Sequence, residues 1–547
     1  MNEEATSNSR RNPPDLSAKI TGLAFCWGNP ALIEYYLNLT DWLKDQGGME
    51  FVFITTNPQG KFYFLQRGAT AFTIKELVET SASYPDLDVP GEDLKKLSDY
   101  DREIGFNWIA KKTFPGRADD AESYFQWQAQ KILTAFSFLI DAVKPNVVLT
   151  WTGAMLAQTA PAYLARKRGI PCFFLERGLL PGTLVVDTEG VNYASSIAGE
   201  KWDKLAVPCP SGEEAALARQ YCQTLGQEGK TVVATGKELT PDELREALQI
   251  EPDHKVILFP LQIEWDSNIL KYSPHYKSMT AIIADLQKAL HGREDVVLVI
   301  KPHPEDKERY SELRALLGPR SRMSVDLALH SLLRVADVVV TINSTVGLEA
   351  LAQRKPVVTL GKAIYGEKGF TLDLSAPGEL KHILGRALQD AQDRRFNEQE
   401  FFRFLIRLLK HHLFSLAQTD PLASRQNIAQ QIILAARQAE IPSTPAPPAF
   451  DLLRDRNREI MELLSVSRAP TPSPLAFLLI GPEPAFAELI TRTFPGARID
   501  LLGAWNIWSR ALALPLTRYD YAMSFGNFTW KEKTVWSLVR ARRKWRF

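Results

Sequence analysis

The feature that most constrains the fold of this chain is a series of short, uninterrupted apolar runs, each followed by a segment of helix length. In the first half the runs cover 20–26, 49–55, 146–151 and 171–175. In the second half they cover 255–261, 295–301, 336–342 and 356–360. Runs without polar alternation are typical of strands buried on both faces, which occur in parallel sheets covered by helices. The chain is therefore predicted to be α/β, with two Rossmann-like units in series.

The spacing of these runs divides the chain of 547 residues into domains. We expect a disordered leader at 1–17, an N-terminal Rossmann-like domain at 18–235, a second at 236–395, a helical segment packing back on the core at 396–440, a Pro-rich linker at 441–474 and a small α/β module with a basic tail at 475–547. Ligands of such units bind at the carboxyl ends of the strands, so the site is predicted in a cleft between the two domains.

The composition of the chain limits which partners and which cellular compartment we expect for it. The formal net charge is +1, so the chain has no overall field that attracts nucleic acid, and none is expected as a partner. The N-terminus lacks the apolar segment of a signal peptide, and no run reaches the roughly 18 apolar residues of a membrane span. The four cysteines form no CxxC pair and no zinc spacing, which favours free thiols. These observations predict a cytoplasmic protein.

Two polar segments follow strands of the second unit. Lys301 and His303, in the sequence Lys-Pro-His-Pro, can both donate hydrogen bonds to a phosphate. Further along, Asn343, Ser344 and Thr345 join a strand to a helix, and either hydroxyl can cap that helix at an anion-binding N-terminus. A surface loop with an incidental histidine and an ordinary helix cap are the alternatives. Together, in this order, the segments favour a clamp for nucleotide phosphates.

The loop after the first strand of the second unit carries Gln262 and Asp266. A glutamine can bind a base edge, and an aspartate a ribose or sugar hydroxyl. An ordinary polar loop is the alternative.

The first unit offers acids. Glu176 ends a strand and Asp187 follows it, so they can supply the two carboxylates that sugar transfer with retention uses. Asn192 and Ser196 can donate to sugar hydroxyls or a carboxylate. The alternatives are a Glu176 paired with Arg177 and an Asp187 in a surface hairpin.

The tail at 534–547 interleaves five basic residues with Trp, Leu and Phe, so it can lie on an anionic membrane surface. A solvated terminus or a packed terminal helix is the alternative.

Four blocks in this order resemble the capsule polysaccharide biosynthesis family: FFLERGLLPGTLVVDTEGVNYASS, LFPLQIEWDSNI, KPHP and ADVVVTINSTVGLEALAQRKPVVTLGKAIYGEKGFT. The resemblance covers about 140–375 and includes bacterial β-Kdo transferases. It implies a GT-B fold, CMP-Kdo as donor and no metal. It also implies that His303, Ser344 and Thr345 hold the CMP phosphate, that Lys301 neutralises it, and that a carboxylate of the Glu-X-Gly block serves the chemistry. Many members have a second acid where this chain has Arg177.

The expected function is therefore a retaining, metal-independent glycosyltransferase that transfers a sugar, Kdo from CMP-Kdo, to a lipid-linked or glycan acceptor. It needs no cofactor beyond the nucleotide sugar, and the inner-membrane surface and capsule assembly proteins are expected partners. A CDP-glycerol-type glycerophosphotransferase and a non-catalytic subunit of capsule assembly or export remain as alternatives.

Overall fold

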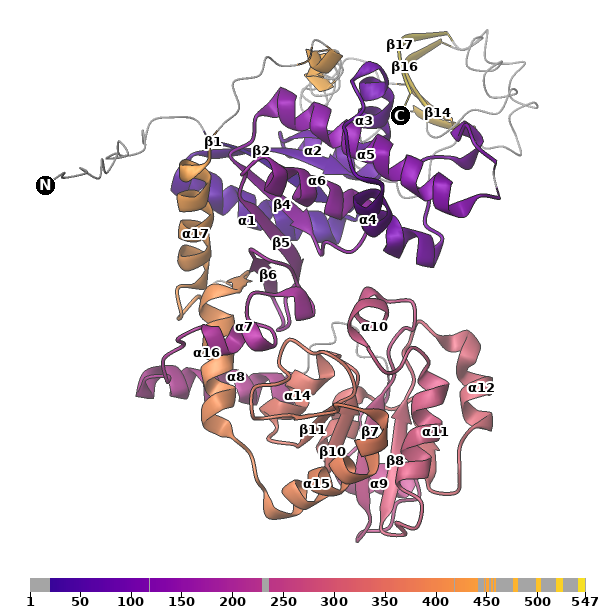
Figure 1. Ribbon diagram of the computed structural model, residues 1–547, viewed down its shortest axis with the longest axis vertical. Coiled ribbons are helices and arrows are strands. Elements are labelled where there is room, and N and C mark those ends of the chain that lie inside the picture. Colours follow the sequence, from indigo (N-terminus) through magenta and orange to yellow (C-terminus); the bar gives the residue numbers. More distant parts are fainter. Residues whose placement is uncertain are drawn as a thin grey trace, which may run out of the picture.

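The computed structural model (Figure 1) describes residues 20–117, 119–228, 236–417 and 419–440, together with 447, 449–451, 454–455, 457–458, 476–480, 498–502, 518–524 and 540–546. The predicted leader at 1–17 and most of the predicted linker at 441–474 lie outside these residues.

The first domain is built on a seven-stranded sheet in the order β13-β6-β5-β4-β1-β2-β3. Its strands are β1 (Ile20–Cys26), β2 (Met49–Thr55), β3 (Thr70–Thr73), β4 (Val147–Trp151), β5 (Cys172–Arg177), β6 (Thr183–Asp187) and β13 (Leu413–Ser415). β1 to β5 pair in parallel, whereas β6 and β13 are antiparallel. The helices are α1 (Pro30–Gly47), α2 (Pro58–Gln66), α3 (Ile74–Thr80), α4 (Gly91–Ile104), α5 (Ala121–Val143) and α6 (Leu156–Lys167).

The second domain repeats this plan with six parallel strands in the order β12-β11-β10-β7-β8-β9. They are β7 (Lys255–Pro260), β8 (Val296–Lys301), β9 (Ser321–Met323), β10 (Val338–Thr341), β11 (Val357–Thr359) and β12 (Leu372–Asp373). The helices are α9 (Pro241–Ala247), α10 (Ser267–Tyr272), α11 (Met279–Ala289), α12 (Tyr310–Ala315), α13 (Leu329–Val335), α14 (Val346–Ala352) and α15 (Leu380–Asp393). In each sheet the first strand, β1 or β7, is central, and the strands that follow are added first on one side of it and then on the other. The predicted α/β, GT-B-like class with two Rossmann-like domains is confirmed.

Local sequence explains why the first helix begins and ends where it does. The Asn29 side chain accepts a hydrogen bond from the backbone of Ala31, and Pro30 occupies the first turn, where its missing N–H costs nothing. Gly48 ends the helix in the left-handed conformation, with φ of 65°. These signals direct the chain from β1 into α1 and back to β2, which places the β1–α1 turn at the carboxyl edge of the sheet.

Helices that cross between the domains hold them together (Figure 1). The chain leaves the first domain through α7 (Glu200–Lys204) and α8 (Gly212–Glu228) and returns through α16 (Glu398–His411), β13 and α17 (Ser424–Gln438). One buried apolar cluster contains Val185 of the first domain, Leu348 of the second and Phe404 of α16. The contact between the domains therefore rests partly on a shared core, which orients their carboxyl edges.

The C-terminal residues contribute a separate sheet of four parallel strands in the order β15-β14-β16-β17. The strands are β14 (Ala476–Ile480), β15 (Arg498–Leu502), β16 (Arg518–Ser524) and β17 (Arg540–Arg546). Within the basic tail, residues 540–546 form an extended strand whose backbone pairs with β16, and not the terminal helix considered from the sequence; the other residues of the tail lie outside the described ones.

Candidate functional site

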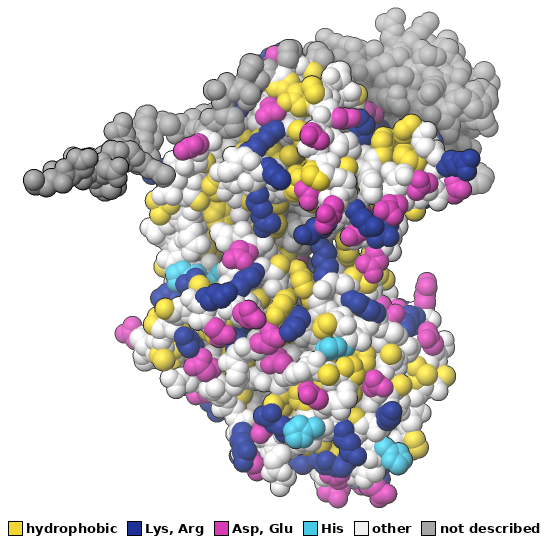
Figure 2. Space-filling model, in the orientation of Figure 1, with side chains coloured by type: hydrophobic (Ala, Val, Ile, Leu, Met, Phe, Trp, Pro, Cys, Tyr) yellow, Lys and Arg dark blue, Asp and Glu magenta, His cyan; other side chains and the backbone are white. Residues whose placement is uncertain are grey.

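The switch points of the two sheets define where a ligand is expected. Strand order reverses between β1 and β4 in the first domain and between β7 and β10 in the second. In the space-filling view the outline narrows between the domains, and Lys, Arg, Asp and Glu side chains line this waist (Figure 2). The two domains touch across it, because the Tyr100 hydroxyl on α4 donates to the Trp265 carbonyl at 3.3 Å and the Tyr193 hydroxyl donates to Glu367 Oε2 at 2.8 Å.

Gln262 and Asn343 meet at the switch point of the second domain, although 81 residues separate them. Gln262 Nε2 donates to Asn343 Oδ1 at 2.9 Å, and Gln262 Oε1 accepts from the Asn343 backbone at 3.2 Å and from the Thr341 hydroxyl at 3.3 Å. The Asn343 amide also donates to the carbonyl of Asn268 at 3.0 Å. The loops after β7 and β10 are therefore tied into one rigid polar edge.

His303 lies on the neighbouring loop after β8 and is half-buried. Its Nδ1 accepts from the Glu305 backbone at 3.3 Å, and its carbonyl accepts from the Tyr310 hydroxyl at 3.0 Å. Because Nδ1 acts as an acceptor, the neutral ring carries its proton on Nε2, which makes Nε2 the donor that a phosphate needs.

Lys301 is used differently from the sequence prediction. Its side chain is buried, and Nζ donates to the carbonyl of Val325 at 2.6 Å. Burial lowers the pKa of Lys301, and the charge of Asp326 opposes that shift. The ammonium thus ties the end of β8 to a backbone carbonyl, and the neutralisation of phosphate by Lys301 stays a prediction.

The turn from β10 into α14 is held by its own hydrogen bonds. Ser344 Oγ accepts from the Val346 backbone at 3.2 Å, whereas Thr345 makes no side-chain cap. The Tyr365 hydroxyl donates to the Ser344 carbonyl. A Cβ atom built on Gly347 would lie 2.1 Å from that hydroxyl and would clash with it. Glycine therefore lets a buried tyrosine support the turn. Only one of the two predicted caps forms, and α14 has seven residues, so its dipole is weak.

Asp266 also has a structural role. Its carboxylate accepts from the Asn268 backbone at 2.7 Å and caps α10. Its neighbour Trp265 is 64% exposed, which is unusual for a side chain of this size. Because the Asp266 carboxylate caps α10, part of its hydrogen-bonding capacity is already used, and its contact with a ribose or sugar hydroxyl stays a prediction.

Glu176 occupies the end of β5 in the first domain, half-buried, beside an exposed Arg177. Its Oε1 accepts from the Arg177 backbone at 3.1 Å. Its charge contributes to the raised pKa of Tyr36, behind the larger effects of burial and of Cys26. Glu176 therefore combines a place at the carboxyl edge with partial exposure, as a reacting carboxylate requires.

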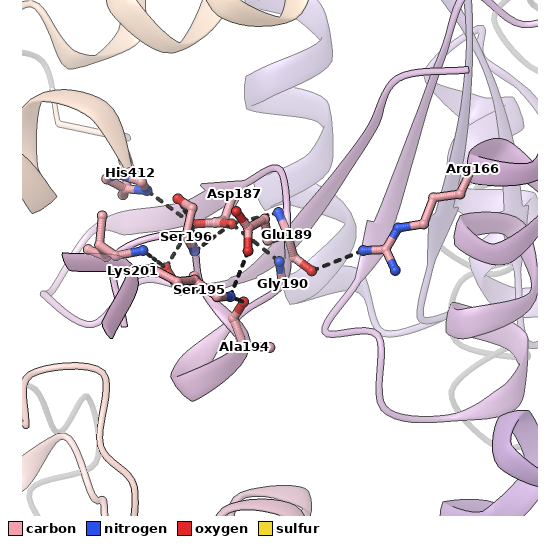
Figure 3. A network of polar contacts seen from close by, with 10 residues as sticks. Arg166, Asp187, Glu189, Gly190, Ala194, Ser195, Ser196, Lys201 and His412 are labelled. Carbon is pink, nitrogen blue, oxygen red and sulfur yellow. Dashed lines mark hydrogen bonds and ion pairs between the residues drawn. The ribbon is translucent and has the colours of Figure 1, made fainter. Parts of the chain in front are cut away.

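Asp187 lies at the centre of a closed network (Figure 3). Its carboxylate accepts from the backbones of Glu189 and Gly190 at 2.8 and 3.2 Å and from the hydroxyls of Ser195 and Ser196 at 2.7 and 2.9 Å. His412 Nδ1 lies 3.2 Å away, and the Asp187 side chain is 0% exposed.

Burial alone would raise the pKa of Asp187, but His412 and the other donors outweigh it and lower the pKa to about 2. A carboxylate surrounded by donors and closed to solvent holds a loop in place. Asp187 therefore anchors this loop, together with Ser196, and its catalytic role stays a prediction.

Asn192 stands beside this anchor with φ of 56°, at the start of the turn that presents Tyr193 to the second domain. The Tyr193 ring lies 6.0 Å from that of Tyr272, and Lys362 Nζ lies 5.6 Å from the Tyr193 ring. The anchored loop therefore forms one of the bridges between the domains, next to the predicted substrate-binding position of Asn192.

A second bridge contains a carboxylate that the sequence reasoning missed. Asp101 on α4 accepts from Trp108 Nε1 at 2.6 Å and from the backbone of Leu156 at 2.7 Å. Across the boundary, Lys271 Nζ donates to the carbonyl of Ala154 at 3.3 Å and lies 5.6 Å from the Tyr100 ring.

Burial raises the pKa of Asp101 to about 6, although its two donors and Lys271 oppose the shift. A lone Asp within a polar helix gives no local signal of this environment. Among the described residues, no group of three His, Cys, Asp or Glu side chains has the arrangement of a metal site.

Comparison with known proteins identifies a family that part of the chain resembles. Residues 218–393 match the family described as "Capsule polysaccharide biosynthesis protein". This segment of the chain is similar to the capsule polysaccharide biosynthesis family. The match covers the C-terminal part of α8 and nearly all of the second domain, including Gln262, His303 and the turn at Asn343, and it confirms the resemblance inferred from the sequence blocks.

Curated relatives are similar over part of their length. Protein FixF of Sinorhizobium fredii is 27% identical over 289 residues, which are 51% of this chain and 63% of FixF. The capsule polysaccharide export protein KpsS of Escherichia coli is 36% identical over 135 residues, 23% of this chain and 34% of KpsS. The chain thus spans less than two thirds of the length of these relatives.

Solved structures give more distant similarity. The β-Kdo 2,7 transferase structure of Thermosulfurimonas dismutans KpsC is 20% identical, with a TM-score of 0.34, and the match covers 53% of this chain and 84% of that one. Separately, no helix among the described residues combines the length and apolar character needed to cross a bilayer.

Proposed function

We propose that this protein is a glycosyltransferase of surface polysaccharide biosynthesis that uses a nucleotide-activated sugar, with CMP-Kdo as the donor. One observation carries the proposal: the second domain gathers Gln262, Asn343 and His303 at one carboxyl edge, and the first domain presents Glu176 at its own. Two such edges on facing Rossmann-like domains suit a donor that has a nucleotide at one end and a reacting sugar at the other. The match to the capsule polysaccharide biosynthesis family, a resemblance that implies CMP-Kdo as donor, supports the choice of sugar.

In this proposal the second domain holds the nucleotide. His303 Nε2–H donates to the phosphate, and the Ser344 turn contributes hydroxyl and backbone donors beside it. Gln262 uses one N–H on Asn343 and directs the other to the base or ribose. The rigid edge built by Gln262 and Asn343 reduces the entropy lost on binding, because these donors are already oriented.

The first domain supplies the chemistry. As the bond between the sugar and the phosphate breaks, positive charge develops on the sugar ring and the phosphate leaves with CMP. The Glu176 carboxylate stabilises that charge or bonds transiently to the ring; the acceptor hydroxyl then bonds to the same carbon, displaces Glu176 and passes its proton to the phosphate of the departing CMP. Asp187 contributes by holding the loop that carries Asn192 and Tyr193 beside the sugar.

Nucleotide binding is the first test. The purified protein is titrated with CMP, UDP and CDP-glycerol while its thermal unfolding is followed. A ligand present at 100 times its Kd adds about 2.7 kcal/mol to the free energy of unfolding. Of these three ligands, we expect only CMP to raise the melting temperature, and we expect His303→Ala to remove that increase. The exposed His291, on the same domain, gives the control variant His291→Ala, which should respond as the wild type does.

Turnover is the second test. Incubation with CMP-Kdo and a Kdo-primed glycolipid should release CMP, and Glu176→Gln should reduce kcat at least 100-fold while CMP binding persists. Release of CMP at an unchanged rate by Glu176→Gln would exclude Glu176 from the chemistry. A response to CDP-glycerol but not CMP would favour a glycerophosphotransferase instead.

A non-catalytic role in capsule assembly or export is a second candidate, favoured by one observation. Arg177 is exposed at the position where the resemblance implies a second acid, and its charge lies next to Glu176. A protein that binds none of the three nucleotides would support this candidate. Arg177→Asp tests it further, because turnover that appears only in this variant would mean that the natural arginine suppresses catalysis.

A further inference from the structure

A loop of the second domain, residues 361–371 between β11 and β12, supports the turn that leads into α14. In this loop, the strap, the Tyr365 hydroxyl donates to the Ser344 carbonyl. The carbonyl of Lys362 accepts from the side-chain amide of Asn343 at 3.4 Å. Both contacts are made to the turn that the proposed function assigns to the nucleotide. The position of the strap therefore bears directly on the geometry of that turn.

The strap also reaches the first domain, through one carboxylate. Glu367 Oε2 accepts from the Tyr193 hydroxyl at 2.8 Å, and Glu367 Oε1 pairs with Lys362 Nζ. The same ammonium lies 5.6 Å from the centroid of the Tyr193 ring. Gly199 leaves room for this contact, because a Cβ built on it would lie 2.5 Å from the Tyr193 hydroxyl. Glu367 thus joins a cation of the second domain to a hydroxyl of the first.

The backbone at Glu367 is held in an uncommon conformation. Its φ is 60°, in the left-handed region that residues other than glycine seldom adopt. Two side chains fix it there: Asp373 Oδ2 accepts from the Glu367 backbone at 2.9 Å, and Lys368 Nζ donates to the Gly366 carbonyl at 3.1 Å. Strained residues that the surrounding contacts hold in place are concentrated at functional sites. The strain at Glu367 therefore points to a use for the direction of its side chain.

Lys368 is buried at a cost in stability. It is 6% exposed, and Nζ lies 5.5 Å from the ring centroid of Trp202 on α7 and 5.6 Å from that of Phe404 on α16. Burial lowers the pKa of Lys368 to about 8, and nearby carboxylates, led by Glu367, oppose that shift. An ammonium whose pKa is lowered by folding destabilises the folded state. The lysine instead places the strap against helices that cross between the domains.

We propose that Glu367 is a positioning residue that couples the orientation of the two domains to the geometry of the nucleotide turn. While Glu367 holds Tyr193, the first domain and the strap move together, and the strap holds the turn at Asn343. The effect on turnover rests on the proposed function, since the alignment of Glu176 with the sugar depends on how the domains meet. The side chains of Lys362 and Glu367 are 43% and 33% exposed, so their ion pair contributes little to stability, and variants of Glu367 should fold.

Amide hydrogen exchange of the full-length protein without ligand tests the coupling independently of activity. Tyr193→Phe removes the donor in the first domain, and Glu367→Ala removes the acceptor in the second. We expect each variant to speed exchange at residues 343–350 at least fivefold, although Tyr193 belongs to the other domain. The double variant should show no further increase, because the two side chains form one contact. Glu294→Ala, at an exposed position of the second domain, is the matched control and should exchange as the wild type does.

Turnover with CMP-Kdo and a Kdo-primed glycolipid tests the positioning role. Tyr193→Phe should lower kcat at least tenfold and change the Kd for CMP less than twofold, because the turn opens more often but is still closed most of the time. A Kd that weakens as much as kcat falls would overturn the positioning role, as would an unchanged kcat. Unchanged exchange at residues 343–350 in a folded Tyr193→Phe protein would overturn the coupling itself. A wild type that neither binds CMP nor turns over would refute the proposed function, and the exchange result would still decide the coupling.

Discussion

Two buried aspartates in the first domain experience opposite electrostatic environments. Asp187 and Asp101 are both almost closed to solvent, at 2% and 0% exposure. Asp187 accepts from two hydroxyls and three backbone N–H groups and lies against His412, and its pKa falls to about 2 despite burial. Asp101 accepts from one indole and one backbone N–H, and burial raises its pKa to about 6. The number of donors, not the depth of burial, decides the charge.

This difference separates two functions that look alike in sequence. A carboxylate with every lone pair occupied holds structure, and its loss exposes many unpaired donors. A carboxylate with few donors, in a bridge between domains, changes protonation near neutral pH and can alter how the domains meet. Asp101 and Lys271 are therefore the pair to examine for an effect of pH on the interdomain bridge.

Removing the anchor gives the largest expected effect. Asp187→Ala should lower the free energy of unfolding by about 3–5 kcal/mol, because it leaves several buried donors without an acceptor. Urea unfolding at pH 7 measures this. Asp88→Ala, at an exposed position, should change stability by less than about 0.5 kcal/mol. If the two variants were equally stable, Asp187 would not be an anchor.

The raised pKa of Asp101 predicts a loss of stability as pH rises. Its folded pKa of about 6 lies above the unfolded value of about 3.9, so the folded state binds the proton more tightly. The protonated form contributes stability that is fully present below about pH 4 and falls by about 3 kcal/mol by pH 7. Urea unfolding between pH 4 and 7 should show this decline in the wild type relative to Asp101→Asn. Parallel pH profiles would contradict the assignment.

Asp187 predicts the reverse dependence at lower pH. Its folded pKa of about 2 lies below the unfolded value of about 3.9, so its contribution is complete above about pH 4 and is lost as pH falls toward 2. The loss is about 2–3 kcal/mol. The same measurement on Asp187→Asn, extended to pH 2, should lack this component of the acid decline, while Asp101→Asn should retain it.

The smallest expected effect comes from removing one of the two hydrogen-bond donors to Asp101. Trp108→Phe deletes the indole N–H that Asp101 accepts, so the pKa of Asp101 should rise above 6 and stability at pH 7 should fall by about 1 kcal/mol. The carboxyl signal of Asp101, followed by NMR across a pH titration, reports the pKa directly. An unchanged pKa in Trp108→Phe would show that the indole does not hold the charge.

Much of the second-domain site could be predicted, because its residues follow strands in the sequence. Gln262, His303 and Asn343 each come directly after an apolar run, and parallel strands bring their carboxyl ends to one edge. Hydrogen bonds from a side chain to a distant segment could not be predicted. Lys301 reaches the carbonyl of Val325, and no pattern around Lys301 announces it.

The first-domain site was harder for the same reason. Asp187 was expected to be a catalytic carboxylate, with a surface hairpin as the alternative, but β13 pairs with β6 and brings His412 against it from the C-terminal end of α16. Asp101 lies 55 residues before the backbone N–H of Leu156 that it accepts from. These partners are set by how helices and strands pack, and sequence periodicity carries no information about them.

The apolar runs by themselves determined two sheets with parallel cores and the polar loops at their carboxyl edges, since hydrophobic burial depends on local patterning. Only the tertiary structure decided which acids are anchors, which change protonation and which remain open to a ligand. Charge and reactivity depend on the donors and the solvent that reach a group, and those arrive from segments far away in the chain.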